Sequence, residues 1–203
     1  MKHRIELIEV TKKYGKRSVL NGVSLSLDSY HNYILVGENG CGKTTLFNII
    51  SGYDRDYHGE IRLNGLSVGY LLQSDMLFRN LTVRENLILQ AAATNKNKET
   101  GIVERISQRL NLQDILGRRV YELSGGEKKK VSIAQIMIKD TDVVLMDEPT
   151  ANMQKTHAKD IINTIFNAFG DKILVISSHD DLFAYDGKTI RLELKDGRIN
   201  GAV

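Results

Sequence analysis

Alternation of apolar and polar residues predicts two antiparallel segments. Residues 23–28 (VSLSLD) and 191–195 (RLELK) carry an apolar side chain at every second position, as expected of strands with one buried and one exposed face. Asp196 and Gly197 follow the second segment and favour a tight hairpin turn. The pattern therefore predicts an antiparallel β part near the N-terminus and a hairpin near the C-terminus.

Three other apolar stretches are unbroken. Residues 33–36, 143–146 and 173–176 consist of apolar residues throughout. Such runs suit strands that are buried on both faces of a parallel sheet. The sequence therefore predicts an α/β fold whose core is a mainly parallel sheet.

Helical periodicity lies between these strands. Residues 158–169 place apolar side chains on one helical stripe. Thr82 is a candidate N-cap of a helix that runs to Ala93. Two further helices are predicted over residues 102–110 and 125–139.

The domain organisation follows from this distribution. Residues 73–139 are almost wholly helical in pattern, apart from a polar stretch at 94–100 that predicts a surface loop. We therefore expect a single domain over residues 1–203. Its core comprises residues 1–73 and 140–203, and a helical subdomain over residues 74–139 is inserted into that core.

Composition narrows the class of protein. Of 203 residues, 41% are hydrophobic and 26% are charged, and the formal net charge is +3. These values are typical of a soluble globular protein, and the charge is too small to indicate nucleic-acid binding. Cys41 is the only cysteine, so an internal disulfide is excluded and a reducing compartment is expected. Because no apolar run is long enough to span a bilayer and residues 1–6 do not resemble a signal peptide, we expect a cytoplasmic protein that reaches a membrane through a partner.

A phosphate-binding loop is predicted at residues 37–44 (GENGCGKT), which fit G-x-x-x-x-G-K-[ST] between a buried strand and an apolar helix over residues 46–50. Glycines let successive backbone N–H groups surround phosphate oxygens, and the helix N-terminus adds a positive dipole end. The lysine is expected to reach the terminal phosphates, and the threonine hydroxyl to bind Mg²⁺. The candidate ATP-binding residues here are Gly37, Glu38, Asn39, Gly40, Cys41, Gly42, Lys43, Thr44 and Thr45.

An acidic pair follows the apolar stretch at 143–146. Asp147 and Glu148 lie where ligands bind in open α/β sheets, at the carboxyl end of a strand. Asp147 is a candidate Mg²⁺ ligand, and Glu148 is a candidate base that orients the attacking water. Taken alone, the pair is equally well explained as solvated acids at the end of a strand.

The segment Leu123-Ser124-Gly125-Gly126-Glu127 resembles the signature sequence of ABC ATPases. Other elements occur in that family's order: Tyr14 before the phosphate loop, Gln73 after a short strand, residues 77–86, residues 148–152, and His179 after the strand over 173–176. The resemblance covers nearly the whole chain. It implies the ABC ATPase fold and an ATPase that powers transport.

The resemblance also implies roles for individual residues. Tyr14 would stack on adenine, Gln73 would contact the nucleotide and Mg²⁺, and His179 would contact the γ-phosphate as a catalytic residue with Glu148 and Lys43. In this family two subunits face head to tail around two ATP molecules. The signature residues of this chain would therefore contact the ATP that is bound to a second copy or to a homologous ATPase subunit. These residues are Ser124, Gly125, Gly126 and Glu127. The remaining partner would be an integral membrane subunit, with this chain on the inner face of the membrane.

Some positions depart from the family pattern. Glu127 stands where glutamine is commonest in the family. Glutamate also occurs at this position, notably in exporters of the macrolide and lipoprotein-release type. Gln154 stands where the family usually has aspartate. That aspartate helps to couple the two ATP sites across the dimer, so its absence concerns the strength of this coupling and not catalysis. The short chain resembles subunits of bacteriocin and antimicrobial-peptide exporters. The lysine run at 128–130 is expected to be a solvated first helical turn.

Two alternatives belong to other functional classes. The same ATPase head occurs in proteins that repair DNA, hold chromosomes or act on ribosomes, but those usually carry a long coiled-coil insertion or two heads. A head that assists iron–sulfur assembly or haem-linked export also fits the chain length. No nucleic-acid partner is expected.

Overall fold

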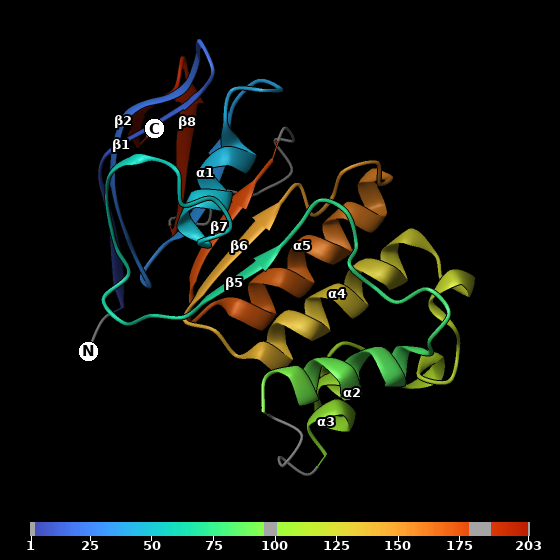
Figure 1. The fold of residues 1–203 in the computed structure, drawn as a ribbon. Coiled ribbons are helices and arrows are strands. Elements are labelled where there is room, and N and C mark those ends of the chain that lie inside the picture. The colour runs from blue at the N-terminus through green and yellow to red at the C-terminus, as the bar shows by residue number, and fades with distance from the viewer. Residues whose placement is uncertain (1–2, 96–100, 179–187, 203) are drawn as a thin grey trace.

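The computed structural model describes residues 3–95, 101–178 and 188–202. Two β-sheets lie on either side of one helix, and further helices cover the far face of the larger sheet (Figure 1). The smaller sheet is antiparallel with the strand order β2-β1-β4. Its strands are β1 (Arg4–Tyr14), β2 (Arg17–Asp28) and β4 (His58–Arg62).

The larger sheet has the strand order β5-β6-β7-β3-β8-β9, and only β9 at its edge is antiparallel to its neighbour. Its parallel strands end at a common edge, where ligands of α/β folds bind. The strands are β3 (Asn32–Val36), β5 (Val68–Leu71), β6 (Val143–Asp147), β7 (Ile173–Ser177), β8 (Thr189–Lys195) and β9 (Arg198–Ala202).

Each face of the larger sheet carries its own hydrophobic core. One core contains α1 (Lys43–Ile50) and the inner face of the smaller sheet, so that Phe47 is fully buried between the two sheets. The other core joins the opposite face to the remaining helices. This division follows from the unbroken apolar strands, which present apolar side chains to both faces.

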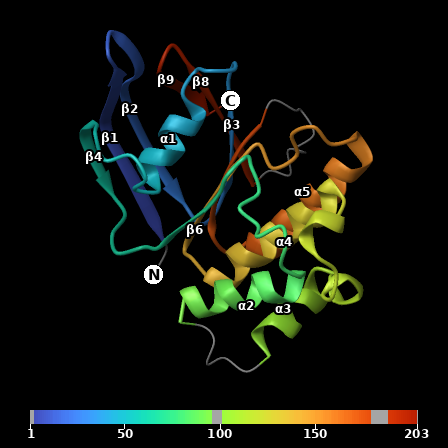
Figure 2. The ribbon, with the colours of Figure 1, turned by 45° about the vertical axis from the view of Figure 1, so that its right-hand side comes forward.

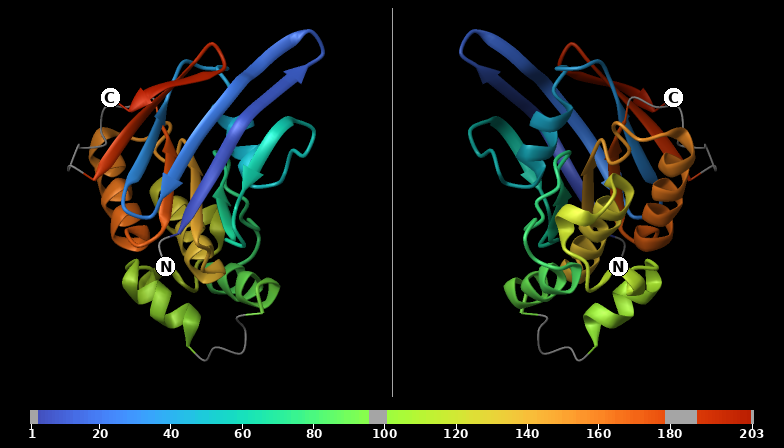
Figure 3. Two further views of the ribbon diagram at one scale, coloured as in Figure 1. Left: turned by 90° about the vertical axis from the view of Figure 1, so that its left-hand side faces the viewer. Right: turned by 90° about the vertical axis from the view of Figure 1, so that its right-hand side faces the viewer.

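The remaining helices gather on one side of the larger sheet (Figure 2). α4 and α5 pack against the sheet, and α2 and α3 lie beyond them, away from the β1–β2 hairpin (Figure 3). Within the described ranges, no helix is long and apolar enough to cross a membrane. The helices are α2 (Val83–Ala93), α3 (Ile102–Arg109), α4 (Gly125–Lys139) and α5 (Lys155–Phe169), with 3-10 turns η1 (Gln113–Ile115) and η2 (Val120–Glu122).

The predicted α/β fold is confirmed, including the parallel strands, the antiparallel N-terminal sheet and the C-terminal hairpin. Thr82 caps α2 as predicted. The alternation analysis missed β1 and β4. A bulge with Glu9 at φ 51 shifts the alternation within β1, and the short β4 has no fully buried residue.

Candidate active site

The predicted phosphate loop connects β3 to α1. Gly42 precedes α1 with φ 116, a conformation that favours glycine. A Cβ on Gly37 would lie 2.5 Å from the backbone oxygen of Leu194, so that position also requires glycine. The ammonium of the buried Lys43 donates to the backbone oxygens of Gly37 at 2.8 Å and Glu38 at 3.2 Å. The loop is therefore wrapped around the amine of Lys43.

Thr44 and Asp147 meet at the common edge of the parallel strands. The Thr44 hydroxyl donates to Asp147 Oδ2 at 2.6 Å, and the Ser177 hydroxyl donates to Asp147 Oδ1 at 2.6 Å. Asp147 is buried. The phenol of Tyr70 lies 3.4 Å from Asp147 Oδ2, and burial, reinforced by this carboxylate, raises the pKa of Tyr70. A hydroxyl and a carboxylate are the oxygen donors that Mg²⁺ prefers, so the donor set at this point fits that ion.

Glu148 follows β6 in a strained backbone conformation, with φ 45. Its carboxylate accepts a hydrogen bond from Gln73 Nε2 at 3.1 Å and lies 3.9 Å from Lys43 Nζ. Its backbone N–H donates to the Ser177 hydroxyl at 2.9 Å. The conformation directs the Glu148 side chain toward Lys43 and Gln73, while the preceding Asp147 faces Thr44.

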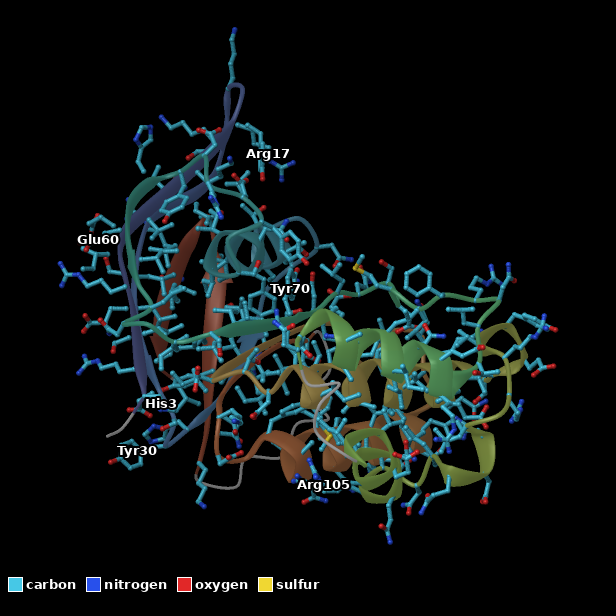
Figure 4. The ribbon with its side chains drawn as sticks, turned by 60° about the horizontal axis from the view of Figure 1, so that its bottom comes forward. His3, Arg17, Tyr30, Glu60, Tyr70 and Arg105 are labelled. Carbon is cyan, nitrogen blue, oxygen red and sulfur yellow. The ribbon has the colours of Figure 1, made fainter. Side chains whose placement is uncertain are left out.

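Lys43, Thr44, Gln73 and Glu148 line one cavity of about 740 Å³, and Asp147 lies beneath Thr44 without lining it. The cavity is formed by segments that are far apart in the sequence, from the end of β1, the phosphate loop, the segment after β5 and the segment after β6. Figure 4 shows Arg17 near the turn between β1 and β2. It shows Tyr70 between α1 and the group of helices that contains α2 and α4. The cavity is lined by Tyr14, Arg17, Val19, Asn39, Gly40, Gly42, Lys43, Thr44, Thr45, Gln73, Glu148, Ala151 and Asn152.

A second cavity of about 490 Å³ lies on the other side of the phosphate loop. Gly37, Glu38 and Cys41 line this cavity, whereas Asn39 and Gly40 line both. The structure thus separates three of the predicted loop residues from the cavity that contains Lys43. Such loops bind phosphate through backbone N–H groups, so the side chains of Glu38 and Cys41 are not required to face the Lys43 cavity.

Tyr14 lies at the rim of the larger cavity and is half exposed. Its hydroxyl donates to Asp54 Oδ2 at 3.0 Å, and the ammonium of the buried Lys12 lies 4.8 Å from its ring centroid. Lys12 forms an ion pair with Asp54 at 2.8 Å. The ring is therefore held from one side by a charged pair.

Ser124 begins α4 as its N-cap. Its hydroxyl accepts from the backbone N–H of Glu127, and its own N–H and hydroxyl each donate to Glu127 Oε2 at 2.8 Å. These bonds from Ser124 lower the pKa of Glu127. A Cβ on Gly125 or Gly126 would meet open space. In the described part of the chain, none of these four residues lines the cavity that contains Lys43.

Several contacts of the site were missed by sequence reasoning. Ser177 was signalled only by being a polar residue at the end of an apolar strand. Arg17 donates to the backbone oxygen of Gly40 at 3.0 Å, and no motif marks it.

The expectation of a solvated lysine run was wrong for Lys129, which is buried because it pairs with Asp75 at 3.1 Å. The predicted catalytic residue His179 lies outside the described residues.

The chain is similar in sequence to known ATP-binding proteins of transporters. The family model described as "ABC transporter" matches residues 20–151. The lipoprotein-releasing system ATP-binding protein LolD of Porphyromonas gingivalis is 28% identical, over 95% of this chain and 97% of LolD. The spermidine/putrescine import ATP-binding protein PotA of Legionella pneumophila is 36% identical, over 73% of this chain and 44% of PotA. The chain thus spans less than half the length of PotA.

A solved structure shows the same fold. The ADP conformation of MJ1267, an ATP-binding cassette of an ABC transporter, superposes with a TM-score of 0.84 and is 25% identical. The alignment covers 99% of this chain and 90% of that structure. The likeness therefore extends over both sheets and all the helices.

Proposed function

The chain belongs to the ABC transporter family as an ATP-hydrolysing subunit, and we propose that two copies close head to tail around two Mg-ATP molecules to drive transport through a separate membrane subunit. The observation that carries the proposal is the convergence of Lys43, Thr44, Asp147, Glu148 and Gln73 at one edge of the sheet. This constellation combines a cation, oxygen ligands for a metal and a carboxylate base.

The phosphate loop and its neighbours bind the nucleotide in this proposal. Lys43 exchanges its contacts with loop oxygens for the terminal phosphates, and the loop N–H groups hold the remaining phosphate oxygens. Thr44, Asp147 and Gln73 would hold Mg²⁺, which would neutralise charge on the phosphates when bound. Tyr14 stacks on adenine at the rim of the cavity, supported by Lys12 and Asp54.

Glu148 orients the attacking water and accepts its proton. Its carboxylate is placed for this by its strained backbone, by the amide of Gln73 and by the ammonium of Lys43. Lys43 also stabilises negative charge as the terminal phosphoryl group is transferred. His179 contacts the γ-phosphate in this proposal.

The second copy supplies what this cavity does not contain. Ser124, Gly125, Gly126 and Glu127 lie at the N-terminus of α4, where backbone N–H groups and the helix dipole attract anions. They do not line the Lys43 cavity among the described residues. We propose that they contact the ATP held by the phosphate loop of a second copy, or of a homologous ATPase subunit.

The proposed dock for the membrane subunit is a groove that is lined by the segment after α1, by β5 and the segment after it, and by α2 and α4. It has a volume of about 550 Å³. Large apolar side chains on its lining are exposed, namely Tyr53, Met76, Phe78 and Leu89. Exposed apolar clusters of this kind mark interaction sites. Docking there would hold the chain on the inner face of the membrane.

Export is the proposed direction of transport. The support is the match to a lipoprotein-releasing protein over nearly the full length of both chains. The import protein is more identical but matches a shorter region. ATP-dependent movement of the cargo into or out of inside-out vesicles that contain the membrane subunit decides the direction.

Replacement of Glu148 by glutamine tests the catalytic assignment. The E148Q chain is expected to bind ATP, to lose most turnover, and to accumulate as a dimer with ATP because hydrolysis no longer separates the copies. Light scattering after size-exclusion chromatography measures the mass. The control is E104Q, on the exposed outer face of α3. Turnover by E148Q at the unsubstituted rate would remove Glu148 from the proposed role.

Purification from detergent-solubilised membranes tests the transport assignment. We expect a polytopic membrane protein to co-purify and to raise the ATPase rate. Retention of ribosomes or DNA, without a membrane protein, would support the alternative class of ABC ATPases instead.

A further inference from the structure

Lys129 is a buried lysine in the second turn of α4, only 5% exposed. Its ammonium lies 3.1 Å from Asp75 Oδ1 and donates to the backbone oxygen of Gln73 at 3.4 Å. The hydroxyl of Ser132, one turn later on the same helix, donates to Asp75 Oδ1 at 3.1 Å. Lys129 and Ser132 of α4 therefore both bind the segment that follows β5.

The burial of Lys129 distinguishes it from the lysine beside it. Lys130 points to α5 and pairs with the exposed carboxylate of Asp160 at 2.7 Å. Burial of an ammonium is unfavourable unless a partner of opposite charge compensates it. Asp75 provides that compensation, and it is only one-quarter exposed itself. The arrangement therefore fixes Lys129 and Asp75 relative to each other.

Gln73 connects this pair to the active site. Its backbone oxygen accepts from Lys129, while its side-chain amide donates to Glu148 Oε2 at 3.1 Å. A continuous set of contacts thus joins Glu148 to α4, the helix that begins with Ser124. Because the Gln73 backbone is restrained on the α4 side, the direction of its amide is restrained as well.

We infer that Lys129 is a positioning residue that aligns the Gln73 amide on Glu148 and makes that alignment depend on the position of α4. The inference rests on the proposed roles of Glu148 and Gln73. A movement of α4 relative to β5 pulls the Gln73 backbone through Lys129, so that Glu148 is held for catalysis in one arrangement and released in another. Loss of such alignment lowers kcat more than it alters ATP binding.

Methionine at position 129 removes the charge and keeps an unbranched apolar side chain in the buried space. The K129M chain is therefore expected to fold, since Asp75 retains access to water. We expect its ATPase kcat to fall about tenfold, with the KM for ATP within about twofold of the unsubstituted chain. K129R keeps the charge and should retain most of kcat. K130M, the same change on the same helix without contact to Gln73, is the matched control.

The deciding measurement combines K129M with Q73A in the full chain. If Lys129 acts through Gln73, the K129M change has no further effect on kcat in the Q73A background. Equal kcat for K129M and K130M, or reductions that multiply in the double variant, would overturn the inference. ATPase activity of the unsubstituted chain and of E148Q reports separately on the proposed function.

Discussion

Ser177 joins the two acidic residues at the end of β6. Its hydroxyl accepts the Glu148 N–H and donates to Asp147 Oδ1. Alanine at position 177 leaves both groups without this partner in a buried site, so we expect S177A to lower the free energy of unfolding by about 2 kcal/mol. ATP turnover should fall with it, because the Asp147 carboxylate and the Glu148 backbone each lose a restraint. Urea denaturation and steady-state ATPase assays measure the two effects.

Ser107 offers a matched control for that change. It is fully buried on α3, and its hydroxyl has no hydrogen-bond partner within the part of the chain that the structure describes. S107A should therefore leave the stability unchanged or raise it. Equal destabilisation by S177A and S107A would show that lost packing, and not the hydrogen bonds, explains the result.

Asp54 makes the support of Tyr14 sensitive to acid. The hydrogen bond from Lys12 holds the pKa of Asp54 below its ordinary value of 3.8. Because the folded-state pKa is lower than the unfolded one, this contribution to stability is present above the ordinary value and is lost as the pH falls through the lowered pKa. The stability difference between the unsubstituted chain and D54N should thus be constant from about pH 6 to pH 8 and shrink below about pH 4. A difference that grows on acidification would contradict this assignment.

At the scale of elements, Asn86 fixes the entry into α2. The fully buried side chain accepts from the backbone N–H of Phe78 at 2.8 Å and donates to the backbone oxygens of Phe78 at 3.1 Å and Thr82 at 2.9 Å. N86A leaves several backbone groups unpaired, so we expect a loss of about 3 kcal/mol in urea denaturation. N163A, at an exposed position on α5, should change stability by less than about 0.5 kcal/mol.

Local signals explain which elements were predictable. α4 and α5 carry their caps or apolar stripes within one segment, and α4 begins and ends as predicted at Gly125 and Lys139. Strand β1 was missed because its bulge at Glu9 depends on pairing with two neighbouring strands. The division of the chain at residues 73/74 and 139/140 stays a prediction.

For the whole molecule, the sequence motifs indicated the residues of the site but not what holds them. The order of the motifs resembles that of ABC ATPases, and this resemblance implied the ABC ATPase fold. The contacts of Lys12 with Asp54, of Arg17 with Gly40 and of Lys129 with Asp75 join residues that are distant in the sequence. No local pattern specifies such pairs, since each depends on how separate elements pack.

The groove proposed for the membrane subunit leads to a test with neighbouring residues of α2. Leu89 and Ile88 are similarly exposed, at 45% and 49%, but only Leu89 is among the groove-lining residues. Aspartate at position 89 places a charge in the apolar groove, where a docked partner would have to bury it. L89D should therefore lose the membrane subunit during purification in detergent, whereas I88D should retain it. Because both positions are exposed, both variants should unfold at similar urea concentrations. Equal retention of the membrane subunit by L89D and I88D would place the docking surface elsewhere.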